Sequence, residues 1–363
     1  MKKRTLLITG GHVTPALAVI EEVKKNYDWE IVWVGRKFAM EGETISSLEY
    51  EIIPQLGIPF YNLETARLQR KFTKWTIPAL LRLPKGMVQA FWLLWQIKPR
   101  VILSFGGYIS VPMVFAGWLL RIPIILHEQT AASGLANRTS AQFANHIAIS
   151  YQSSFIDFPH HKAIVTGNPV RRSILRMKRH LTHPPAIFIT GGSQGSRTIN
   201  YAVNEILTKL IGKFTVFHQT GYADYEKLEV RQKRLDENQK EKYHIFPVVD
   251  PNRLAEILGK SSLVIGRSGA NTVTEIAAIG IPAIFIPLPY SERGEQEKNA
   301  KMLADINLAR IISQNELTGK LLWETINDFL AHPPDDKVKK EAKKLIHKNA
   351  AAKIVSLINR YME

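Results

Sequence analysis

The fold is decided by the stretch Leu263-Val-Ile-Gly-Arg-Ser-Gly-Ala-Asn-Thr-Val-Thr-Glu-Ile-Ala-Ala-Ile-Gly-Ile-Pro-Ala-Ile-Phe-Ile-Pro287. A short β-branched run leads into a glycine turn, a helical segment that stops at Gly280, and a second apolar run after Pro282. Thr272 and Glu275 have the spacing of a capping box, which predicts that the helix opens there. Such a unit aims helix N-terminal amides at whatever lies above the strand, which favours an anion such as a phosphate.

Two other parts of the chain repeat this order. Near the start, the run Thr5–Ile8 leads into the turn Thr9-Gly10-Gly11-His12 and then into a helical segment. Later, the run Ala186–Thr190 leads into the glycine turn Gly191–Ser196 and a helix expected over Thr198–Leu210. Strands that alternate with helices predict parallel, right-handed units. The fold class is therefore predicted to be α/β, with two similar halves in tandem.

Breaks in this pattern give the expected domain boundaries. Asn168-Pro169 marks a turn between the halves, which predicts an N-terminal domain over residues 1–166 and a C-terminal domain over 167–340. The lysine-rich segment Lys337–Met362 predicts a terminal helix with a solvated basic face. Residues 341–363 thus form a third, basic piece that is free to pack back on the N-terminal domain.

Composition narrows the functional classes. The 363 residues include 48 Lys or Arg, 32 Asp or Glu and no Cys, giving a formal net charge of +16. This charge predicts an anionic partner, whether nucleic acid, anionic lipid or a phosphorylated substrate, and the lack of cysteine excludes disulfides and thiolate chemistry. No apolar run reaches about 18 residues, so no transmembrane helix is expected. No signal-peptide pattern follows Met1, so no signal peptide is expected. No Asp-x-Asp pair occurs, and neither a metal nor a cofactor is expected.

Residues 66–127 carry nine Lys or Arg and no acidic residue. The basic residues interleave with aromatic and apolar ones: Arg67, Arg70, Lys71, Phe72, Lys74, Trp75, Leu80, Leu81, Arg82, Lys85, Phe91, Trp92 and Trp95. A basic surface bearing tryptophan is typical of proteins that dock on an anionic bilayer. The alternative is that Met87–Ile97 is a core helix with a solvated charged face. Nucleic acid is less favoured, because no helix-turn-helix, zinc or ribonucleoprotein motif is present.

The first half places three polar loops after expected strands, where open α/β sheets bind ligands. These loops are Gly10–His12, Gly106–Tyr108 and His127–Thr130. His12 is either a general base or a helix-capping or surface group. The first turn is not G-x-G-x-x-G, so it gives little support to a dinucleotide site.

The second half offers its own candidate ligand groups. Gly191–Ser196 can hold a phosphate through backbone amides, but it lacks the Lys-Ser/Thr of a triphosphatase loop, so ATP hydrolysis is not expected. Glu275 either accepts hydrogen bonds from sugar hydroxyls or only caps its helix. Gln296 and Asn299 share one face of a helix start, where they either read sugar hydroxyls or cap the helix.

Six motifs occur in a fixed order along nearly the whole chain. They are Thr-Gly-Gly-His-Val-x-Pro-Ala-Leu-Ala, Phe-Gly-Gly-Tyr-x-Ser, His-Glu-Gln, Gly-Asn-Pro-Val-Arg, Gly-Gly-Ser-Gln-Gly-Ser and Arg-Ser-Gly-Ala-x-Thr-Val-x-Glu-Ile. Each motif alone has little specificity, but the ordered set is highly specific. The chain resembles the MurG family, the N-acetylglucosaminyltransferases of peptidoglycan synthesis.

The resemblance implies the glycosyltransferase B architecture, in which two Rossmann-like domains face a cleft that holds the active site. It implies transfer of GlcNAc from UDP-GlcNAc, with inversion, to the C4 hydroxyl of the MurNAc sugar in undecaprenyl-linked lipid I, which forms lipid II. The implied location is the cytoplasmic face of the cell membrane, as a peripheral protein. The expected partners are then UDP-GlcNAc, lipid I and an anionic membrane surface, with no nucleic acid.

The resemblance also assigns roles to individual residues. His12 and Glu128 become candidates for activating the acceptor hydroxyl. Glu275 would take the ribose hydroxyls, Ser193 the diphosphate, and the backbone near Val249 the uracil. The full set of implied substrate-binding residues is Thr9, Gly10, Gly11, Thr130, Arg171, Ser193, Val249, Ala270, Asn271, Thr272, Val273, Thr274, Glu275 and Gln296.

Two departures from the family pattern matter. The family usually has Gly-Gly before Thr-Gly-Gly-His, whereas Leu7-Ile8 stand here, so a shorter first loop is expected. Thr130 replaces the asparagine that usually follows His-Glu-Gln. Two rival functions remain open: a UDP-GlcNAc 2-epimerase, which shares the architecture and the donor, and a non-catalytic binder of membranes or nucleic acid.

Overall fold

The computed structural model describes residues 4–38, 46–65 and 76–363, with side chains described from residue 83 onward in the last range. The chain divides into two compact units, Met1–Arg171 with His347–Glu363, and Arg172–Ile346. The boundaries expected after residues 166 and 340 lie five and six residues before the observed ones, which follow Arg171 and Ile346. The basic and aromatic residues noted between Arg67 and Trp75, and the side chains of Leu80, Leu81 and Arg82, lie outside the described part of the chain.

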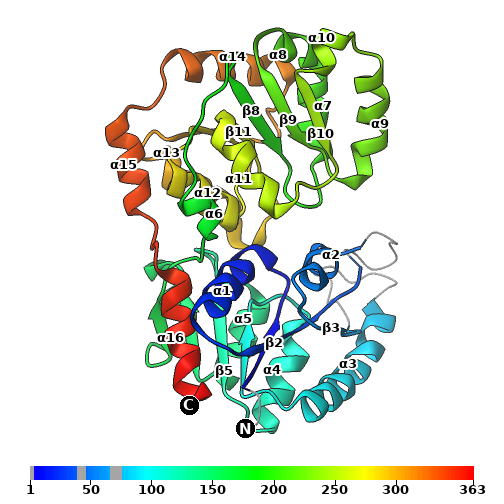
Figure 1. Ribbon diagram of the computed structural model, residues 1–363, viewed down its shortest axis with the longest axis vertical. Helices are drawn as coiled ribbons and strands as arrows, with labels where there is room; N and C mark the ends of the chain where they lie inside the picture. Colours follow the sequence, from blue (N-terminus) through cyan, green and yellow to red (C-terminus); the bar gives the residue numbers. More distant parts are fainter. Residues whose placement is uncertain (1–3, 39–45, 66–75) are drawn as a thin grey trace. The chain divides into compact units, whose positions relative to one another are not determined.

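A seven-stranded sheet forms the centre of the first unit as described (Figure 1). Its strands are β1 (Thr5–Thr9), β2 (Glu30–Gly35), β3 (Phe60–Asn62), β4 (Val101–Ser104), β5 (Ile124–Glu128), β6 (His146–Ile149) and β7 (Ala163–Val165). They are paired in parallel in the order β3-β2-β1-β4-β5-β6-β7. The chain therefore reverses its direction of winding between β1 and β4, the point where sheets of this class bind ligands.

Helices cover both faces of this sheet. They are α1 (Val13–Asn26), α2 (Leu48–Gln55), α3 (Thr76–Ile97), α4 (Ser110–Leu119), α5 (Leu135–Ser140) and α16 (Ala350–Met362), with 3-10 turns at Ala141–Phe143 and Gln152–Asp157. Because side chains alternate along a strand, Leu6 and Ile8 pack on one face of β1 while Leu7 packs on the other. All three are fully buried, as expected for a parallel strand covered on both sides.

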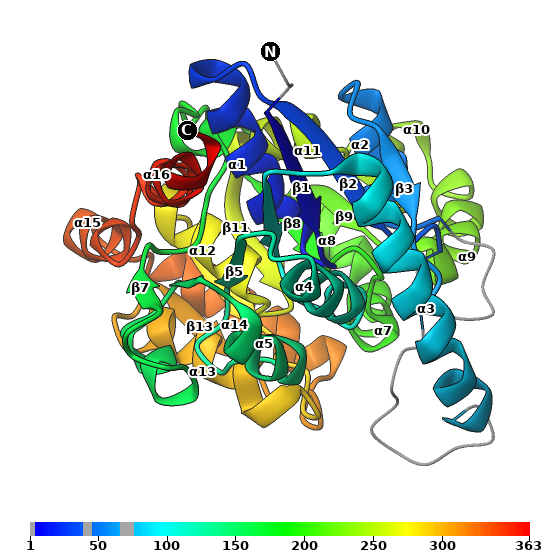
Figure 2. The same ribbon diagram turned by 90° about the horizontal axis from the view of Figure 1, so that it is seen from below.

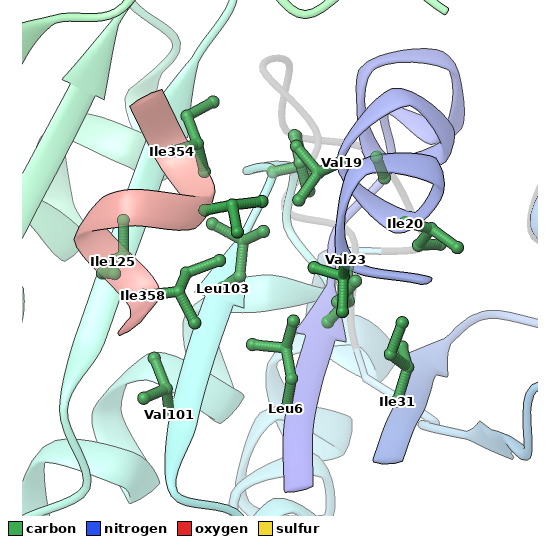
Figure 3. Packing of buried hydrophobic residues seen from close by; sticks show 14 of the residues in the cluster. Leu6, Val19, Ile20, Val23, Ile31, Val101, Leu103, Ile125, Ile354 and Ile358 are labelled. Carbon is green, nitrogen blue, oxygen red and sulfur yellow. The ribbon is translucent and has the colours of Figure 1, made fainter. Parts of the chain in front are cut away.

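The C-terminal helix α16 completes the core of the first unit. Ile354 and Ile358 are one turn apart, so they lie on one helix face, and they belong to the same buried cluster as Leu6 and Leu103 (Figure 3). The same cluster takes in Val19 and Val23 from α1, and helices α1 and α16 are in contact. Residues from the two ends of the chain therefore share one core.

A six-stranded parallel sheet forms the centre of the second unit, in the order β10-β9-β8-β11-β12-β13. The strands are β8 (Ala186–Thr190), β9 (Thr215–Gln219), β10 (Tyr243–Phe246), β11 (Ser261–Gly266), β12 (Ala283–Phe285) and β13 (Ala309–Ile311). The helices are α6 (Arg172–Leu175), α7 (Arg197–Glu205), α8 (Leu207–Lys213), α9 (Tyr222–Lys233), α10 (Glu237–Lys240), α11 (Pro251–Lys260), α12 (Ala270–Ile279), α13 (Glu295–Ala304), α14 (Gly319–Ala331) and α15 (Asp336–Lys344). Winding reverses here between β8 and β11.

Helix α12 begins earlier than its sequence predicts. Its N-cap is Gly269, so Thr272 is already the third helical residue and the predicted capping box with Glu275 is wrong. The glycine turn alone ends β11 tightly enough to start the helix at Ala270. The predicted stop is confirmed, since Gly280 adopts the left-handed conformation (φ 76°) that a C-cap favours.

Two predicted continuous helices are each divided in the structure. Thr198–Leu210 becomes α7 and α8, separated at Ile206, whose own burial in the core redirects the chain so that Leu207 and Leu210 also face inward. The predicted helix Lys337–Met362 becomes α15 in the second unit and α16 in the first. The break coincides with the passage of the chain from one unit to the other.

Candidate functional site

Two glycine turns meet at the switch point of the first sheet. Gly10 has φ +131°, and a Cβ there would lie 2.8 Å from the carbonyl carbon of Phe105. The amide of Gly11 donates to the carbonyl of Gly106 (3.1 Å), which joins the turn after β1 to the turn after β4. Thr9, just before them, is fully buried, and Leu7-Ile8 continue β1 where the family pattern has glycines.

His12 follows these turns as the N-cap residue of α1. Its side chain makes no capping hydrogen bond, so the capping alternative is not what the structure shows. Burial first, and the positive charge of Arg36 second, lower the pKa of His12 to about 4. The imidazole is therefore neutral at pH 7 and has a free lone pair for a proton, although it is a weak base in the protein without ligands.

Glu128 ends β5, and its buried carboxylate is fully engaged. Oε1 accepts hydrogen bonds from the amide (3.0 Å) and hydroxyl (2.6 Å) of Thr130, and Oε2 accepts from the Gly134 amide (3.2 Å) and the Asn137 side chain (3.0 Å). A carboxylate offers about four acceptor positions, so these bonds use its capacity. Burial raises the pKa of Glu128, and the hydrogen bonds oppose that effect. The arrangement suits a group that fixes the loop.

Thr130, at the position where the family has asparagine, is buried within the same loop. Its hydroxyl lies 2.6 Å from Glu128 Oε1 and 2.7 Å from the carbonyl of Ala132. The neighbouring His127 is also buried, which lowers its pKa to about 3, and its Nε2 lies 3.4 Å from the carbonyl of Gly167. These polar groups therefore order the end of β5 from inside.

In the second sheet, the glycine turn after β8 packs on the loop after β9, on the side of β8 away from the switch point with β11. Gly195 has φ +75°, and a Cβ there would collide with the carbonyl of Thr220, so the turn Gly191–Ser196 lies directly on the loop after β9. Ser196 caps α7 by accepting from the Ile199 amide (3.5 Å). Ser193, predicted to contact a phosphate, is exposed at the tip of this turn.

Arg267 links the two turns of the second unit. One Nη donates to the carbonyl of Ile286 (2.9 Å), and the other donates to Ser196 Oγ (2.8 Å) and Gln314 Oε1 (2.6 Å). Burial lowers the pKa of Arg267. Arg267 is the first residue of the motif Arg-Ser-Gly-Ala-x-Thr-Val-x-Glu-Ile, but the sequence did not predict its role. Its hydrogen-bond partners belong to elements that are distant in sequence.

The sequence also did not predict a series of buried, hydrogen-bonded side chains behind the glycine turn. His218 contacts the Tyr243 hydroxyl through Nδ1 and Asn200 Oδ1 through Nε2, both at 3.0 Å, while the Asn200 amide donates to the Thr220 carbonyl (2.8 Å) and to Asp224 (2.8 Å). Burial lowers the pKa of His218 to about 3, so the ring is neutral. This series of side chains fixes the Thr220 backbone against which Gly195 packs.

The predicted residues of α12 divide into two groups. Ala270, Asn271 and Thr272 form its first turn, beside the glycine turn. Val273 is core, and the Thr274 hydroxyl is turned inward onto the Ala270 carbonyl (2.7 Å). Glu275 lies in the second turn and is 7% exposed.

Helix α13 supplies the remaining groups near α12. Ser268 Oγ donates to the Gln296 carbonyl (2.7 Å), and the Asn299 side chain donates to the Ser268 carbonyl (3.2 Å). Asn299 is fully buried, so it holds this loop from inside, whereas Gln296 is only half-buried. Gln296 Oε1 accepts from the Leu288 amide (3.0 Å), and its amide nitrogen can still donate to a ligand.

Two predicted residues have less freedom than expected. The Val249 amide donates to Gln219 Oε1 (3.0 Å), so it is already used within the fold. Arg171 is buried at the end of the first unit, not in the second unit with the other predicted donor residues. Among the described residues, no group of His, Asp or Glu side chains is arranged to hold a metal ion.

Comparisons with known proteins also find two family domains, of which the second extends into α16, a helix that the structure places in the first unit. The Glycosyltransferase family 28 N-terminal domain matches residues 9–149, and the family 28 C-terminal domain matches residues 186–358. The UDP-N-acetylglucosamine--N-acetylmuramyl-(pentapeptide) pyrophosphoryl-undecaprenol N-acetylglucosamine transferase of Halalkalibacterium halodurans is 34% identical over 96% of both chains. The chain belongs to the MurG family. It is a glycosyltransferase, as its MurG resemblance predicted.

Solved structures give the same fold. The crystal structure of Acinetobacter baumannii MurG has a TM-score of 0.65 and 25% sequence identity, covering 98% of this chain and 99% of that one. The UDP-GlcNAc 2-epimerase of Neisseria meningitidis, bound to UDP-GlcNAc, has a TM-score of 0.67 but only 15% identity, covering 98% of this chain and 100% of that one. The predicted glycosyltransferase B architecture is confirmed, while the epimerase likeness concerns the fold alone.

The buried histidine of the second unit predicts sensitivity to acid. The pKa of His218 is about 3 in the folded chain and about 6.5 when unfolded, so the unfolded chain binds more protons between these pH values. Stability is therefore lost as the pH falls through this window. When the pH is lowered from 7 to 5, the free energy of unfolding should fall in both proteins. We expect the fall to be about 2 kcal/mol smaller in His218→Gln than in the wild type.

Urea titrations at both pH values measure this difference. Lys209→Gln is the control, because Lys209 is exposed in the same unit and the variant keeps His218, so it should show the wild-type pH dependence. Equal losses in the wild type and His218→Gln would show that protonation of His218 is not coupled to unfolding.

Proposed function

We propose that this chain transfers GlcNAc from UDP-GlcNAc to the C4 hydroxyl of the MurNAc sugar of lipid I, which forms lipid II, with inversion at the anomeric carbon. One observation carries the proposal: 34% identity over 96% of the chain to a transferase named for this reaction. The six motifs that carry the likeness stand at the carboxyl ends of the sheet strands or in the linker after β7. The motifs thus lie where open α/β sheets bind their ligands.

The second unit would bind the donor. Its diphosphate would lie on the amides of Gly191–Ser196 and the first turn of α12, with the Ser193 hydroxyl as a further donor. The Glu275 carboxylate would accept from the ribose hydroxyls, and the free amide of Gln296 would donate to the sugar. Uracil would be read by the carbonyl of Val249, since its amide is already used.

The chemistry is an in-line displacement. The acceptor C4 oxygen forms the new bond to the anomeric carbon, the bond to the UDP oxygen breaks, and UDP leaves with that electron pair. The fixed amides at the two helix starts stabilise the charge that develops on the diphosphate. Holding the acceptor hydroxyl in line with the leaving group lowers the barrier further.

His12 is the better candidate for the base of this reaction. It is neutral at pH 7 and its side chain is not used in capping, so it can take the proton of the C4 hydroxyl. All four acceptor positions of Glu128 are used by its own loop and by Asn137 of α5, which makes Glu128 a positioning residue. Thr130 would serve that loop in the same way, while Thr9, Gly10 and Gly11 would line the place where the acceptor meets the donor sugar.

We further propose that the first unit docks on the cytoplasmic face of the membrane as a peripheral protein. Helix α3 buries Ala90, Leu93 and Leu94 in the core and lies beside α4 (Figure 2). Its other side and the end of α4 form an aromatic face of exposed residues: Val88, Phe91, Trp92, Trp95, Trp118 and Leu119. None of the described helices has the length and hydropathy to cross a bilayer. A membrane accounts for this face better than nucleic acid does.

The activity has a direct test. Radiolabelled UDP-GlcNAc is incubated with a short-chain lipid I analogue, and we expect labelled disaccharide product and UDP in equal amounts. With UDP-GlcNAc alone, a transferase gives no isomerised sugar nucleotide, whereas an epimerase does. Turnover of UDP-GlcNAc without acceptor, or no label in the lipid, would overturn the proposal.

The donor assignment predicts the behaviour of Glu275. Glu275→Ala should raise the KM for UDP-GlcNAc roughly tenfold or more, because a charged hydrogen bond to the ribose is lost. Initial rates at saturating acceptor measure this. Glu297→Ala, at an exposed position on α13, is the control and should change little. An unchanged KM would leave Glu275 with a purely structural role.

The aromatic face predicts membrane affinity. Trp92 and Trp95 are 55% and 62% exposed, and the ammonium of Lys98 lies 5.6 Å from the Trp95 ring. Replacing both tryptophans with serine should weaken binding to phosphatidylglycerol vesicles about tenfold or more, and added salt should weaken wild-type binding. Vesicle sedimentation measures both effects. Tyr201 is an exposed aromatic residue of the second unit, so the control variant Tyr201→Ser should bind vesicles like the wild type. If the tryptophan variant also bound like the wild type, the aromatic face would not be the membrane-binding surface.

A further inference from the structure

Arg36 is a cation at the candidate acceptor site that the motifs do not include. It directly follows β2, the neighbour of β1, so it stands at the same sheet edge as the turn Thr9–His12. Its guanidinium carbon lies 5.8 Å from the centre of the Tyr108 ring, and Tyr108 belongs to the second glycine turn. Arg36 therefore lies beside both turns.

The charge of Arg36 is maintained by a buried partner. Its Nε lies 3.2 Å from Glu49 Oε1, and the Glu49 side chain is 2% exposed while that of Arg36 is 21% exposed. Although burial opposes its charge, Glu49 and Tyr108 together raise the pKa of Arg36. The ion pair thus holds the guanidinium in place and leaves part of it open to the site.

The two turns themselves have fewer amides to offer than their sequence suggests. The Gly11 amide donates to the Gly106 carbonyl (3.1 Å), and the Gly106 amide donates to Ser104 Oγ (3.2 Å). The glycines at Leu7-Ile8 that the family usually has are replaced by strand residues. A diphosphate at this edge therefore needs positive charge from another group.

We propose that Arg36 binds the diphosphate of the lipid-linked acceptor, as a substrate-binding residue of the first unit. A guanidinium recognises phosphate oxygens through paired N–H donors, which an ammonium does not reproduce. The proposal rests on the proposed function, because it assumes an acceptor that carries a diphosphate. It adds a residue that specifies the acceptor and not the donor.

Acceptor binding would also change the environment of His12. Among the described residues, Arg36 after β2 and His127 on β5 act on the protonation of His12, and Arg36 is the charged one of the two, because burial keeps His127 neutral. A bound diphosphate next to Arg36 cancels the repulsion that disfavours a protonated His12. His12 then becomes a stronger base only when the acceptor is present.

Kinetics with matched variants test the assignment. Arg36→Met alone leaves Glu49 buried without its cation, so the test variant is the double substitution Arg36→Met with Glu49→Gln. It should raise the KM for a short-chain lipid I analogue about tenfold or more and change the KM for UDP-GlcNAc less than about twofold. Glu49→Gln alone keeps the cation but weakens the contact that holds it, so its acceptor KM should lie between those of the wild type and the double variant. Lys37→Met removes an exposed neighbouring charge and should also behave like the wild type.

Binding without turnover separates this inference from the proposed function. Geranyl diphosphate, titrated by calorimetry, should bind the wild type about tenfold or more tighter than the double variant, whether or not the chain transfers GlcNAc. In histidine NMR titrations, the pKa of His12, assigned with His12→Gln, should be higher in the double variant than in the wild type, although burial still holds it below 6.5. Equal affinity for geranyl diphosphate, or an unchanged acceptor KM, would overturn the role of Arg36. A wild type that binds geranyl diphosphate but transfers nothing would overturn only the proposed function.

Discussion

The close approach of backbone to backbone at the glycine turns after β1 and β8 is the constraint on which the rest depends. At Gly10 and Gly195 no side chain fits, because the chain after a neighbouring strand occupies the space of a Cβ. This contact places a helix start directly above the sheet edge in each unit. Backbone amides and helix N-termini can then bind an anionic ligand without any movement of side chains. Because these groups are held by the fold, the positive potential that they provide is fixed in place.

Burial decides which groups around these turns carry charge. His12, His127 and His218 are all neutral at pH 7 because desolvation opposes their protonation. Each unit instead has an arginine beside its glycine turns: Arg36 after β2 and Arg267 after β11. In the second unit, Arg267 donates its hydrogen bonds to protein groups, so it positions the turns. In the first unit, part of the Arg36 side chain remains exposed. Similar architecture thus gives the two arginines different tasks.

The sequence predicted the parts of the molecule that depend on local pattern. The strand-turn-helix units, the parallel sheets and the α12 stop at Gly280 follow from apolar runs and glycines, which act over a few residues. It did not predict the start of α12, because a helix can open on a glycine turn as well as on a capping box. It also missed Arg267, Arg36 and the chain from Tyr243 through His218 to Asn200. Their partners lie far away in sequence, and only the order of strands in the sheet brings them together.

Helix α16 has a consequence for how the protein is made. Ile354 and Ile358 share a cluster with Leu6 and Leu103, so the part of this sheet face that α1 does not cover stays open until more than three hundred further residues have been synthesised after Leu6. A ribosome adds roughly 5–20 residues per second, so this apolar face is uncovered for many seconds while the second unit emerges and can fold. The nascent chain therefore needs protection from aggregation during that interval, and cleavage before residue 350 would remove the cover of a core built mainly from the other end of the chain.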